Sequence, residues 1–496
     1  MRRRLLATTA ALAVLGTSVA AYAADPARVF SLAELRADAH KGQARTTLST
    51  EGVPTTTISD RPCTDEGVAE GTEFACNGVD LLSFVPQSEF GGSAPLVDAL
   101  GGGVSDLWGW VDPANGDEYV IMGKTNGSAL FRVTDPTNPV FLGQLPNKSP
   151  GQLVWHDIKV YRNHAFIVSE SVQHGMDVFD LTRLRGVTEP QDWTIDAHYP
   201  IAFSVHNIAI NEETGYAYIV GGNNGLAAPD HCLANLHMVD ISNPKLPVFA
   251  GCSTTDEGGG LLGLGAALPE SPVNYIHDTQ CVVYRGPDAD HRGRELCFNS
   301  SEDFLSVVDV SDKPFVTQLS QTPYPSVAYA HQGWLSADQR YFFLGDELDE
   351  KGPQQTRTLV FDVSDLEEPV LVAEHQGRTT AIDHNMYEKN GLLYQSNYAA
   401  GLAVLEVAGV PALAEGERES LEVAFFDTFP AHDNAEFVGT WSNYPYFPSG
   451  TIAVSGIDEG LFLLKVQDGV LKRFETRTPP APAAGAPGLE VAAARR

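Results

Sequence analysis

Short stretches in which hydrophobic and polar residues alternate fill most of the chain between residues 105 and 477. Alternation with a period of two places every second side chain on one face of an extended strand, so these stretches predict β-strands. Neighbouring stretches are joined by turn residues such as Asn390 and Gly391, a dipeptide that favours tight hairpins. Because no helical periodicity of useful length interrupts the series, the pattern predicts an all-β protein.

The predicted strands are grouped into repeated units of about 40 to 70 residues. Each unit has a polar head, a hairpin, a third strand that ends in Asp, as in LHMVDISNP and LSVVDVSDKP, and a short fourth strand such as VFAGCS. Four antiparallel strands per unit are typical of the blades of a β-propeller. The seven units begin near Asp106, Trp155, Val205, Ile276, Ala330, Ile382 and Gly439. The predicted fold class is therefore an all-β, seven-bladed β-propeller over residues 105–477, with an N-terminal extension that contains a disulfide.

The two ends of the chain have a different character. The first residues, MRRRLLATTAALAVLGTSVAAYA, combine three arginines, an apolar run and an Ala-x-Ala site, which predicts a secretory signal peptide over residues 1–23, cleaved near Ala23. Residues 24–104 are expected to form the extension, with one short helix and a linker. Residues 478–496 are rich in Pro and Ala and are predicted to be disordered.

Two segments of the chain could supply the strand that completes the last blade and closes the predicted ring. The strand VDLLSFVP, residues 79–86, resembles the fourth strands of the repeats and would complete the last blade. The segment GVLKRFETR, residues 469–477, competes for the same place.

Six cysteines and a signal peptide predict an oxidising compartment. No CxxC motif or zinc spacing is present, so we expect disulfides between sequence neighbours, each closing a local loop, among 15 formal connectivities. The expected pairs are Cys63 with Cys76, Cys232 with Cys252, and Cys281 with Cys297. After the signal peptide, no stretch approaches the roughly 18 apolar residues of a membrane span. We therefore expect a secreted, periplasmic or cell-surface protein.

The formal net charge of −32 limits the classes of molecule that the protein is expected to bind. A surface this acidic repels phosphate backbones and anionic lipids, so we expect no nucleic-acid partner and no direct membrane insertion. The ligand classes left open are protein, peptide and carbohydrate, and we expect a monomer.

A histidine followed by Asp, Asn or Gln stands at the head of five successive units, in WHDIKVY, SVHNIAI, YIHDTQCVV, AHQGWLS and IDHNMYE. These histidines are His156, His206, His277, His331 and His384. In a propeller the first strands line the central channel, so the five imidazoles are expected at one mouth of it. The turns between second and third strands lie on the same face. They are expected to add the carboxyl groups of Glu170, Glu302, Asp346 and Glu347 to this mouth of the channel. Trp108 and Trp441 take the equivalent place in the first and last blades. Nine other histidines are expected to be mostly exposed: His40, His164, His174, His198, His231, His237, His291, His375 and His432.

Three interpretations of this pattern remain open, and one of them is catalysis by these side chains without a metal. Imidazole nitrogens and carboxylate oxygens bind divalent cations, and three or four suffice, so a subset of these side chains predicts a site for Ca²⁺ or a transition metal. The structural interpretation is an internal hydrogen-bond network that ties the strands together without any ligand. The run DELDE at 346–350 lacks the spacing of a calcium loop, and its other interpretation is an exposed acidic turn.

The third-strand series is similar to the LVIVD repeat, and nearly the whole mature chain resembles choice-of-anchor B family proteins. The stretches that carry this resemblance include CNGVDLLSFVP, WGWVDPANGDEY, HNIAINEETGYAY, HDTQCVVYRGPD and WSNYPYFPSG. The family implies an extracellular bacterial propeller with variable carboxyl-terminal anchors, and it transfers no catalytic residue. The tail departs from that pattern because it has no hydrophobic anchor or sorting motif, so we expect a free periplasmic or secreted protein.

The leading functional hypothesis is a binding or interaction module whose recognition face is the channel mouth. The alternative is a metal-dependent enzyme, an oxidoreductase or a hydrolase, that uses a subset of the blade-head histidines. No GxSxG, HExxH or CxxC motif supports a hydrolase independently of such a metal.

Overall fold

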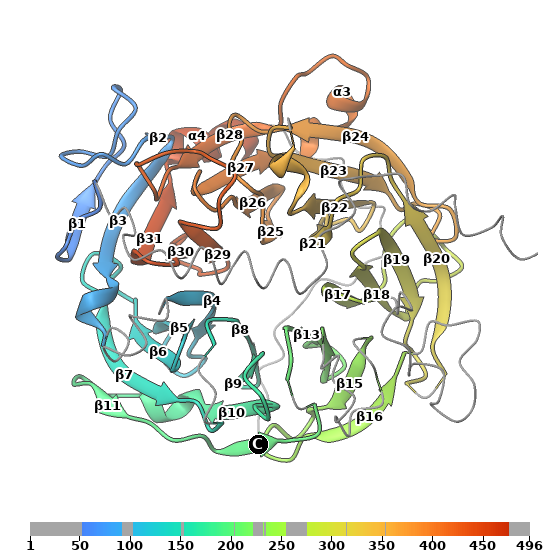
Figure 1. The fold of residues 1–496 in the computed structure, drawn as a ribbon, viewed down its shortest axis with the longest axis horizontal. Helices are drawn as coiled ribbons and strands as arrows, with labels where there is room; N and C mark the ends of the chain where they lie inside the picture. The colour runs from blue at the N-terminus through green and yellow to red at the C-terminus, as the bar shows by residue number, and fades with distance from the viewer. Residues whose placement is uncertain are drawn as a thin grey trace, which may run out of the picture.

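The computed structural model describes residues 52–475 except 92–102, 150–152, 203, 222–231, 233–234, 254–274, 314 and 353. Seven sheets, almost entirely antiparallel, stand around a common axis, with β4, β8, β13, β17, β21, β25 and β29 as their innermost strands (Figure 1). The predicted seven-bladed β-propeller is thereby confirmed. The signal peptide, the predicted short helix and the carboxyl-terminal tail lie outside the described residues.

Four blades each consist of four consecutive strands or nearly so. The second blade contains β8 (His156–Tyr161), β9 (His164–Ser169), β10 (Met176–Asp180) and β12 (Ala197–Tyr199). The third contains β13 (Asn207–Asn211), β14 (Tyr216–Val220), β15 (His237–Asp240) and β16 (Val248–Cys252). The fourth contains β17 (Asp278–Val283), β18 (Glu295–Ser300), β19 (Phe304–Asp309) and β20 (Thr317–Pro323). The fifth contains β21 (Ala330–Leu335), β22 (Tyr341–Asp346), β23 (Arg357–Asp362) and β24 (Val370–Gln376).

The other three blades gain a strand from elsewhere in the chain. The first contains β4 (Val104–Val111), β5 (Glu118–Lys124), β6 (Gly127–Arg132), β7 (Val140–Pro146) and, parallel to β7, β11 (Gln191–Asp192). The sixth contains β25 (Met386–Lys389), β26 (Leu392–Ser396), β27 (Leu402–Glu406), β28 (Glu422–Phe426) and β2 (Cys76–Asn77). The seventh contains β29 (Thr440–Tyr444), β30 (Ile452–Gly456), β31 (Gly460–Val466), β3 (Val79–Pro86) and β1 (Ile58–Arg61). Described helices are η2 (Gln87–Glu89), η3 (Leu181–Leu184), η4 (Asp349–Lys351), η5 (Val407–Gly409), α3 (Val410–Ala414) and α4 (Asp468–Glu475).

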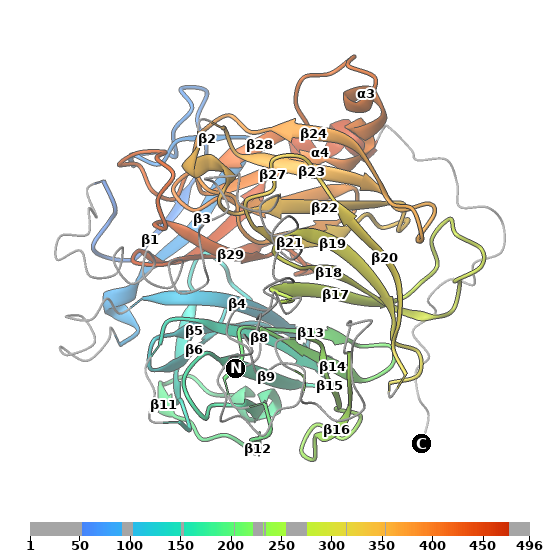
Figure 2. The ribbon, with the colours of Figure 1, turned by 45° about the vertical axis from the view of Figure 1, so that its right-hand side comes forward.

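The ring is closed by the N-terminal extension. β3 pairs antiparallel with β31 and β1 pairs with β3, so both ends of the described chain share the seventh sheet (Figures 1 and 2). Phe84 of β3 packs against Phe462 of β31 at a ring distance of 4.5 Å, and Phe74 packs on the same ring at 5.5 Å. The competing segment of the sequence forms α4 instead.

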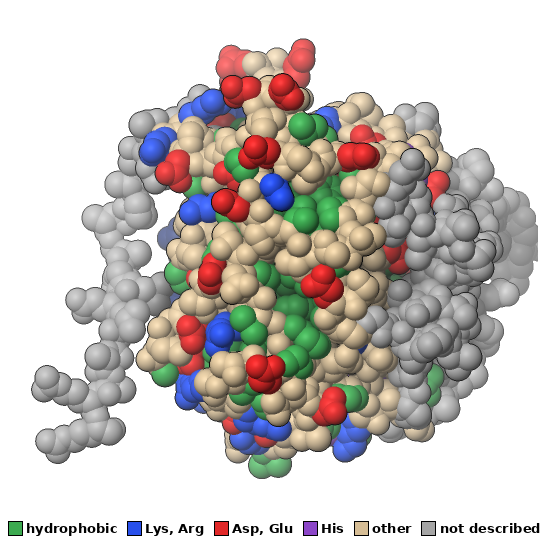
Figure 3. All heavy atoms as spheres, turned by 90° about the vertical axis from the view of Figure 1, so that its left-hand side faces the viewer, with side chains coloured by type: hydrophobic (Ala, Val, Ile, Leu, Met, Phe, Trp, Pro, Cys, Tyr) green, Lys and Arg blue, Asp and Glu red, His purple; other side chains and the backbone are tan. Residues whose placement is uncertain are grey.

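Each blade buries both of its faces against its neighbours. In one core cluster, for example, Tyr119 and Ile121 of the first blade pack with Ile158 and Phe179 of the second. This two-sided burial explains why the strands are rich in Val, Ile, Phe and Tyr. Acidic and basic side chains are interspersed on the side of the molecule shown in Figure 3.

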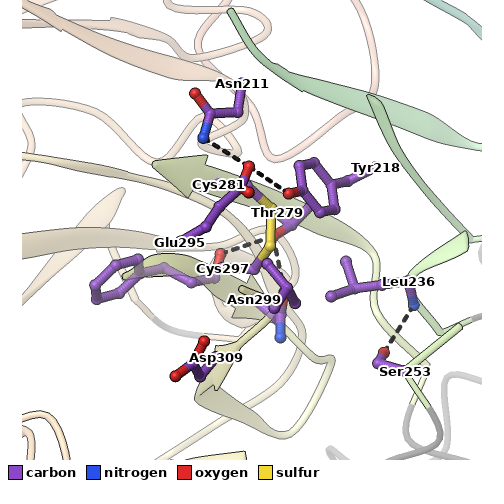
Figure 4. Close-up of a disulfide and its surroundings, with 12 residues drawn as sticks. Asn211, Tyr218, Leu236, Ser253, Thr279, Cys281, Glu295, Cys297, Asn299 and Asp309 are labelled. Carbon is purple, nitrogen blue, oxygen red and sulfur yellow. Dashed lines mark hydrogen bonds between the residues drawn. A yellow bond between two sulfur atoms is a disulfide. The ribbon is translucent and has the colours of Figure 1, made fainter. Parts of the chain in front are cut away.

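The three expected disulfides are confirmed, with Cα–Cα distances of 5.9 Å for Cys63–Cys76, 5.2 Å for Cys232–Cys252 and 4.0 Å for Cys281–Cys297. Cys281 and Cys297 lie directly opposite each other on β17 and β18 (Figure 4). Beside them, buried Glu295 accepts hydrogen bonds from Asn211 and Tyr218 of the third blade, which ties the third and fourth blades together.

The described part of the chain contains no helix with the length and apolar character needed to cross a bilayer.

Candidate functional site

Four of the five blade-head histidines lie side by side. The ring centroids are 4.2 Å apart for His206 and His277, 4.1 Å for His277 and His331, and 4.4 Å for His331 and His384. Trp441 follows at 5.1 Å from His384. We call His206, His277, His331 and His384 the histidine row. It runs along the beginning of the inner strands of four adjacent blades. The side chains of His277, His331 and His384 are buried, and that of His206 is partly exposed.

In most blades the polar residue near the start of the inner strand bonds to the inner strand of the next blade, which fixes neighbouring blades relative to each other. Asp106 accepts from Ile158 N (3.3 Å), Asp157 from Ile208 N (2.7 Å), and Gln332 from Met386 N (2.9 Å). Asn207 donates to His277 O (3.1 Å) and Asn385 to Ser442 Oγ (3.3 Å). We call Asp106, Asp157, Asn207, Gln332, Asn385 and Ser442 the polar ring. It supports the structural interpretation for these residues, since they satisfy buried polar groups between blades.

A carboxylate joins the histidine row at one point. Glu347 Oε2 lies 3.7 Å from His331 Nε2, and Glu347 Oε1 lies 3.7 Å from His384 Nε2. One ligand atom from each residue can be chosen so that all three lie within 4.8 Å of one another. A separation of 3.7 Å is too long for a hydrogen bond. It is close to the roughly 3.4 Å between two ligands of a tetrahedral metal ion with bonds of about 2.1 Å.

The tautomer of His384 and the low pKa values of both imidazoles suit metal binding. His384 Nδ1 donates to the carbonyl oxygen of Trp441, which leaves the lone pair of the neutral ring on Nε2, facing Glu347. Burial lowers the pKa of His384 to about 3, and burial with the neighbouring His277 holds the pKa of His331 well below its usual value. Neutral imidazole is the form that binds metals.

Glu347 is held in a low-dielectric environment. Burial raises its pKa to about 7, against a smaller opposing effect of the Tyr398 hydroxyl, which donates to Glu347 Oε1 at 2.8 Å. A cation between the three side chains would stabilise the ionised carboxylate. Tyr398 is a part of this site that sequence reasoning missed, because it lies in the turn before β27 and outside the repeat head.

The other predicted acids divide into two groups. Glu170 Oε1 lies 2.7 Å from His206 Nδ1 and so stands at the far end of the histidine row. Asp346 accepts bonds from the hydroxyl of Tyr324 and the backbone N–H groups of residues 328 and 329, so it is a structural residue that turns away from the row. Glu302 forms a backbone bridge with Ala330, and its side chain interacts with Tyr329.

Two expectations about exposure are wrong. The DELDE turn is buried, at 0% exposure for Asp346 and 3% for Glu350, because η4 folds it against the fifth and sixth blades. Several histidines outside the repeat head are buried as well. They are His174, His237, His291 and His375.

Trp108 and His156 do not lie with the histidine row. Trp108 packs against Tyr387 and Tyr444 and under the ammonium group of Lys159, 4.5 Å from its ring. His156 packs against His174 at 5.8 Å and bonds through Nδ1 to the carbonyl oxygen of Val154. Burial lowers the pKa of His156 to about 3.

Lowering the pH is expected to destabilise the protein through His156. Its folded pKa of about 3 lies below the ordinary value of 6.5, so the unfolded state binds the extra proton between these values. The free energy of unfolding therefore falls by up to about 1.4 kcal/mol per pH unit in this window as pH decreases, and His156→Gln removes that contribution. Urea unfolding at pH 6 and pH 5 measures the difference in slope. The partly exposed His432→Gln serves as control, and an unchanged slope in His156→Gln would contradict the prediction.

A second group of possible ligands lies on the opposite face, where Asp288, His291 and Glu367 also offer atoms within 4.8 Å. His291 Nε2 already lies 2.7 Å from Glu367 Oε1, and Glu367 is 53% exposed. Because one partner, Glu367, is exposed to solvent, this hydrogen-bonded pair resembles an ordinary contact at the surface more than the fully buried group of the histidine row does.

Comparison with known proteins supports the repeat. A family model described as LVIVD repeat matches residues 232–255, which include β15 and β16. No curated protein matches the chain. Among solved structures, the chain is similar to the computationally designed Ika8 protein, with a TM-score of 0.41, 8% identity and coverage of 73% of this chain and 83% of that chain. A functionally unknown protein from Desulfotomaculum acetoxidans DSM 771 has a TM-score of 0.42, 10% identity and coverage of 67% and 87%.

Proposed function

We propose that this chain is a secreted or periplasmic β-propeller of the choice-of-anchor B type, which binds its partner through a divalent transition metal at the histidine row. The metal ligands are His331, Glu347 and His384. The observation that carries the proposal is the approach of two neutral imidazoles and one carboxylate, all buried, from adjacent blades. Two nitrogens and one oxygen favour zinc, iron, copper or nickel over Ca²⁺, which prefers six or more oxygens.

The fold supports an interaction role. A propeller with an LVIVD repeat suggests an interaction module, and its disulfides suit an oxidising compartment outside the cytoplasm. With three protein ligands, one coordination position stays open for an oxygen or nitrogen of a protein, peptide or carbohydrate ligand.

The stripped protein is expected to bind one Zn²⁺ at this site and to be stabilised by it. At free Zn²⁺ 100 times the dissociation constant, the gain is about 2.7 kcal/mol in the free energy of unfolding. Isothermal titration and thermal melts measure the Zn²⁺ affinity and the gain in stability. The His291→Ala background removes any binding by the second group of possible ligands, Asp288, His291 and Glu367. A protein that takes up no Zn²⁺, Co²⁺, Ni²⁺ or Cu²⁺, and whose melting temperature does not respond to them, would contradict the proposal.

One observation favours a second candidate, a metal-dependent enzyme. Three protein ligands with an open position are typical of catalytic zinc sites, and the Tyr398 hydroxyl holds Glu347 in place with a hydrogen bond. Turnover of activated esters by the Zn²⁺-loaded protein, lost in Glu347→Gln, would support the enzyme. Tight binding of a ligand at the metal without turnover would support the binding module.

A further inference from the structure

A cavity of about 340 Å³ lies inside the propeller, away from the histidine row. It is lined by the inner strands of the first six blades and by the loops at their carboxyl ends, including Glu212 and Arg285. The histidine row stands at the amino ends of the same strands, and none of its residues lines the cavity. The two places share no residue, although Asp278 and Gln332 directly follow His277 and His331, and the inference below does not depend on the proposed metal.

Asp278 faces this cavity and departs from the polar ring. It occupies the same repeat position as Asp157 and Gln332, yet its hydrogen bond runs to the N–H of Thr279 in its own strand, at 2.6 Å. The bond from the fourth blade to the fifth is made by Gln280 instead, which accepts from Leu335 N at 2.8 Å. Since Gln280 ties these blades together, the carboxyl group of Asp278 is not needed for that purpose.

Carboxyl groups outnumber ammonium groups around Asp278, and burial holds the pKa of Asp106 well above its usual value. The ammonium group of Lys159 lies 2.5 Å from Asp157 and 3.3 Å from Asp106, so one cation serves two carboxyl groups before Asp278 is counted. Burial, and next the nearby Asp157, raise the pKa of Asp278 to about 8. A structural role does not explain a carboxyl group kept at this cost, whereas a bound cation would offset it.

Aromatic side chains form one wall of the cavity. Tyr387 packs edge to face against Trp108 at 5.4 Å and against Trp334 at 5.0 Å, and all three rings line the cavity. Aromatic faces beside a carboxylate attract organic cations through both charge and the ring quadrupole.

We propose that this cavity binds a small organic cation, a primary amine with an apolar or aromatic body, whose ammonium group pairs with Asp278. The apolar body packs against Trp334 and Tyr387. The volume, near the lower end of small-molecule sites, fits a ligand of about the size of a substituted aromatic ring.

Three probes of one shape and different charge test this inference: benzylammonium, benzyl alcohol and benzoate. Benzylammonium is expected to bind the full-length protein, with the alcohol at least tenfold weaker and benzoate not bound. Asp278→Asn, which keeps the size of the side chain, is expected to weaken benzylammonium by about 10- to 100-fold, because a charge-assisted hydrogen bond is lost. Isothermal titration gives the affinities, and ligand-observed NMR detects weak binding.

The matched control is Glu388→Gln. Glu388 is a buried carboxyl group on the strand that carries Tyr387, its pKa is raised to about 7 by burial, and it does not line the cavity. This variant and Glu347→Gln are expected to bind benzylammonium like the unmodified protein. Equal affinity for benzyl alcohol, preferred binding of benzoate, or no binding of benzylammonium would each overturn the inference. Loss of metal binding in Glu347→Gln would leave it intact.

Discussion

A chain that begins at Val104 is expected not to fold, whereas a chain that begins at Gly52 is expected to fold like the full-length protein. The shorter chain lacks β3, whose Val79, Leu81 and Phe84 are fully buried or nearly so. Each lost side chain of this kind costs about 2 to 5 kcal/mol, and a domain has only about 5 to 15 kcal/mol in total. The loss also leaves β31 as an unpaired edge, which promotes aggregation.

Both chains can be exported with the same heterologous signal peptide and compared by soluble yield, size-exclusion chromatography and thermal melting. Phe84→Ala tests the same contact more gently and is expected to cost about 3 to 5 kcal/mol. Its control is Phe249→Ala on β16, where the ring is 46% exposed and the expected change is within about 0.5 kcal/mol. A cooperative melt of the Val104 chain at the full-length temperature would show that ring closure does not depend on β3.

Glu347→Gln is expected to reduce Zn²⁺ affinity by at least about 100-fold while the metal-free protein keeps its stability. Glutamine has nearly the same size, and its side-chain oxygen can still accept the hydrogen bond from the Tyr398 hydroxyl. The charge that binds the metal is lost, but the packing is not. Metal content by elemental analysis and urea unfolding of the stripped protein measure the two effects separately.

Glu170→Gln is the matched control, because Glu170 pairs with His206 at the far end of the histidine row. It is expected to leave the Zn²⁺ affinity within about threefold, as a residue beyond the direct ligands. Two results together would contradict the metal site: a loss of several kcal/mol in the stability of stripped Glu347→Gln, and no metal binding by the unmodified protein. The histidine row would then be a hydrogen-bond network that only stabilises the fold.

Much of this architecture could be predicted from the printed sequence. Period-two alternation and the recurring third strand define the blades, because those patterns depend on neighbours within one hairpin. The three cysteine pairs were expected on a similar ground, because the partners of each pair are close together in the sequence. The sequence also indicated that the blade-head histidines recur, but it could not show that His156 packs against His174 while the other four stack.

The choice among acidic residues depends on side-chain direction. Asp346 and Glu347 are adjacent in the sequence, and consecutive side chains at the end of a strand point to opposite sides. Asp346 is therefore bonded to Tyr324, and Glu347 faces the imidazoles of His331 and His384. A one-residue difference in the turn would exchange these roles, which no composition or spacing argument resolves.

By itself the sequence determined the number and kind of blades and the repeated polar head, since these rest on local periodicity and short loops. It favoured the local disulfide pairs without deciding among the 15 formal connectivities. The tertiary structure alone decided that β3 rather than the carboxyl-terminal segment closes the ring, that Glu347 meets two imidazoles, and that Gln280 replaces Asp278 between the fourth and fifth blades. These features join residues far apart in the chain, and their geometry is set by how the blades pack around the axis.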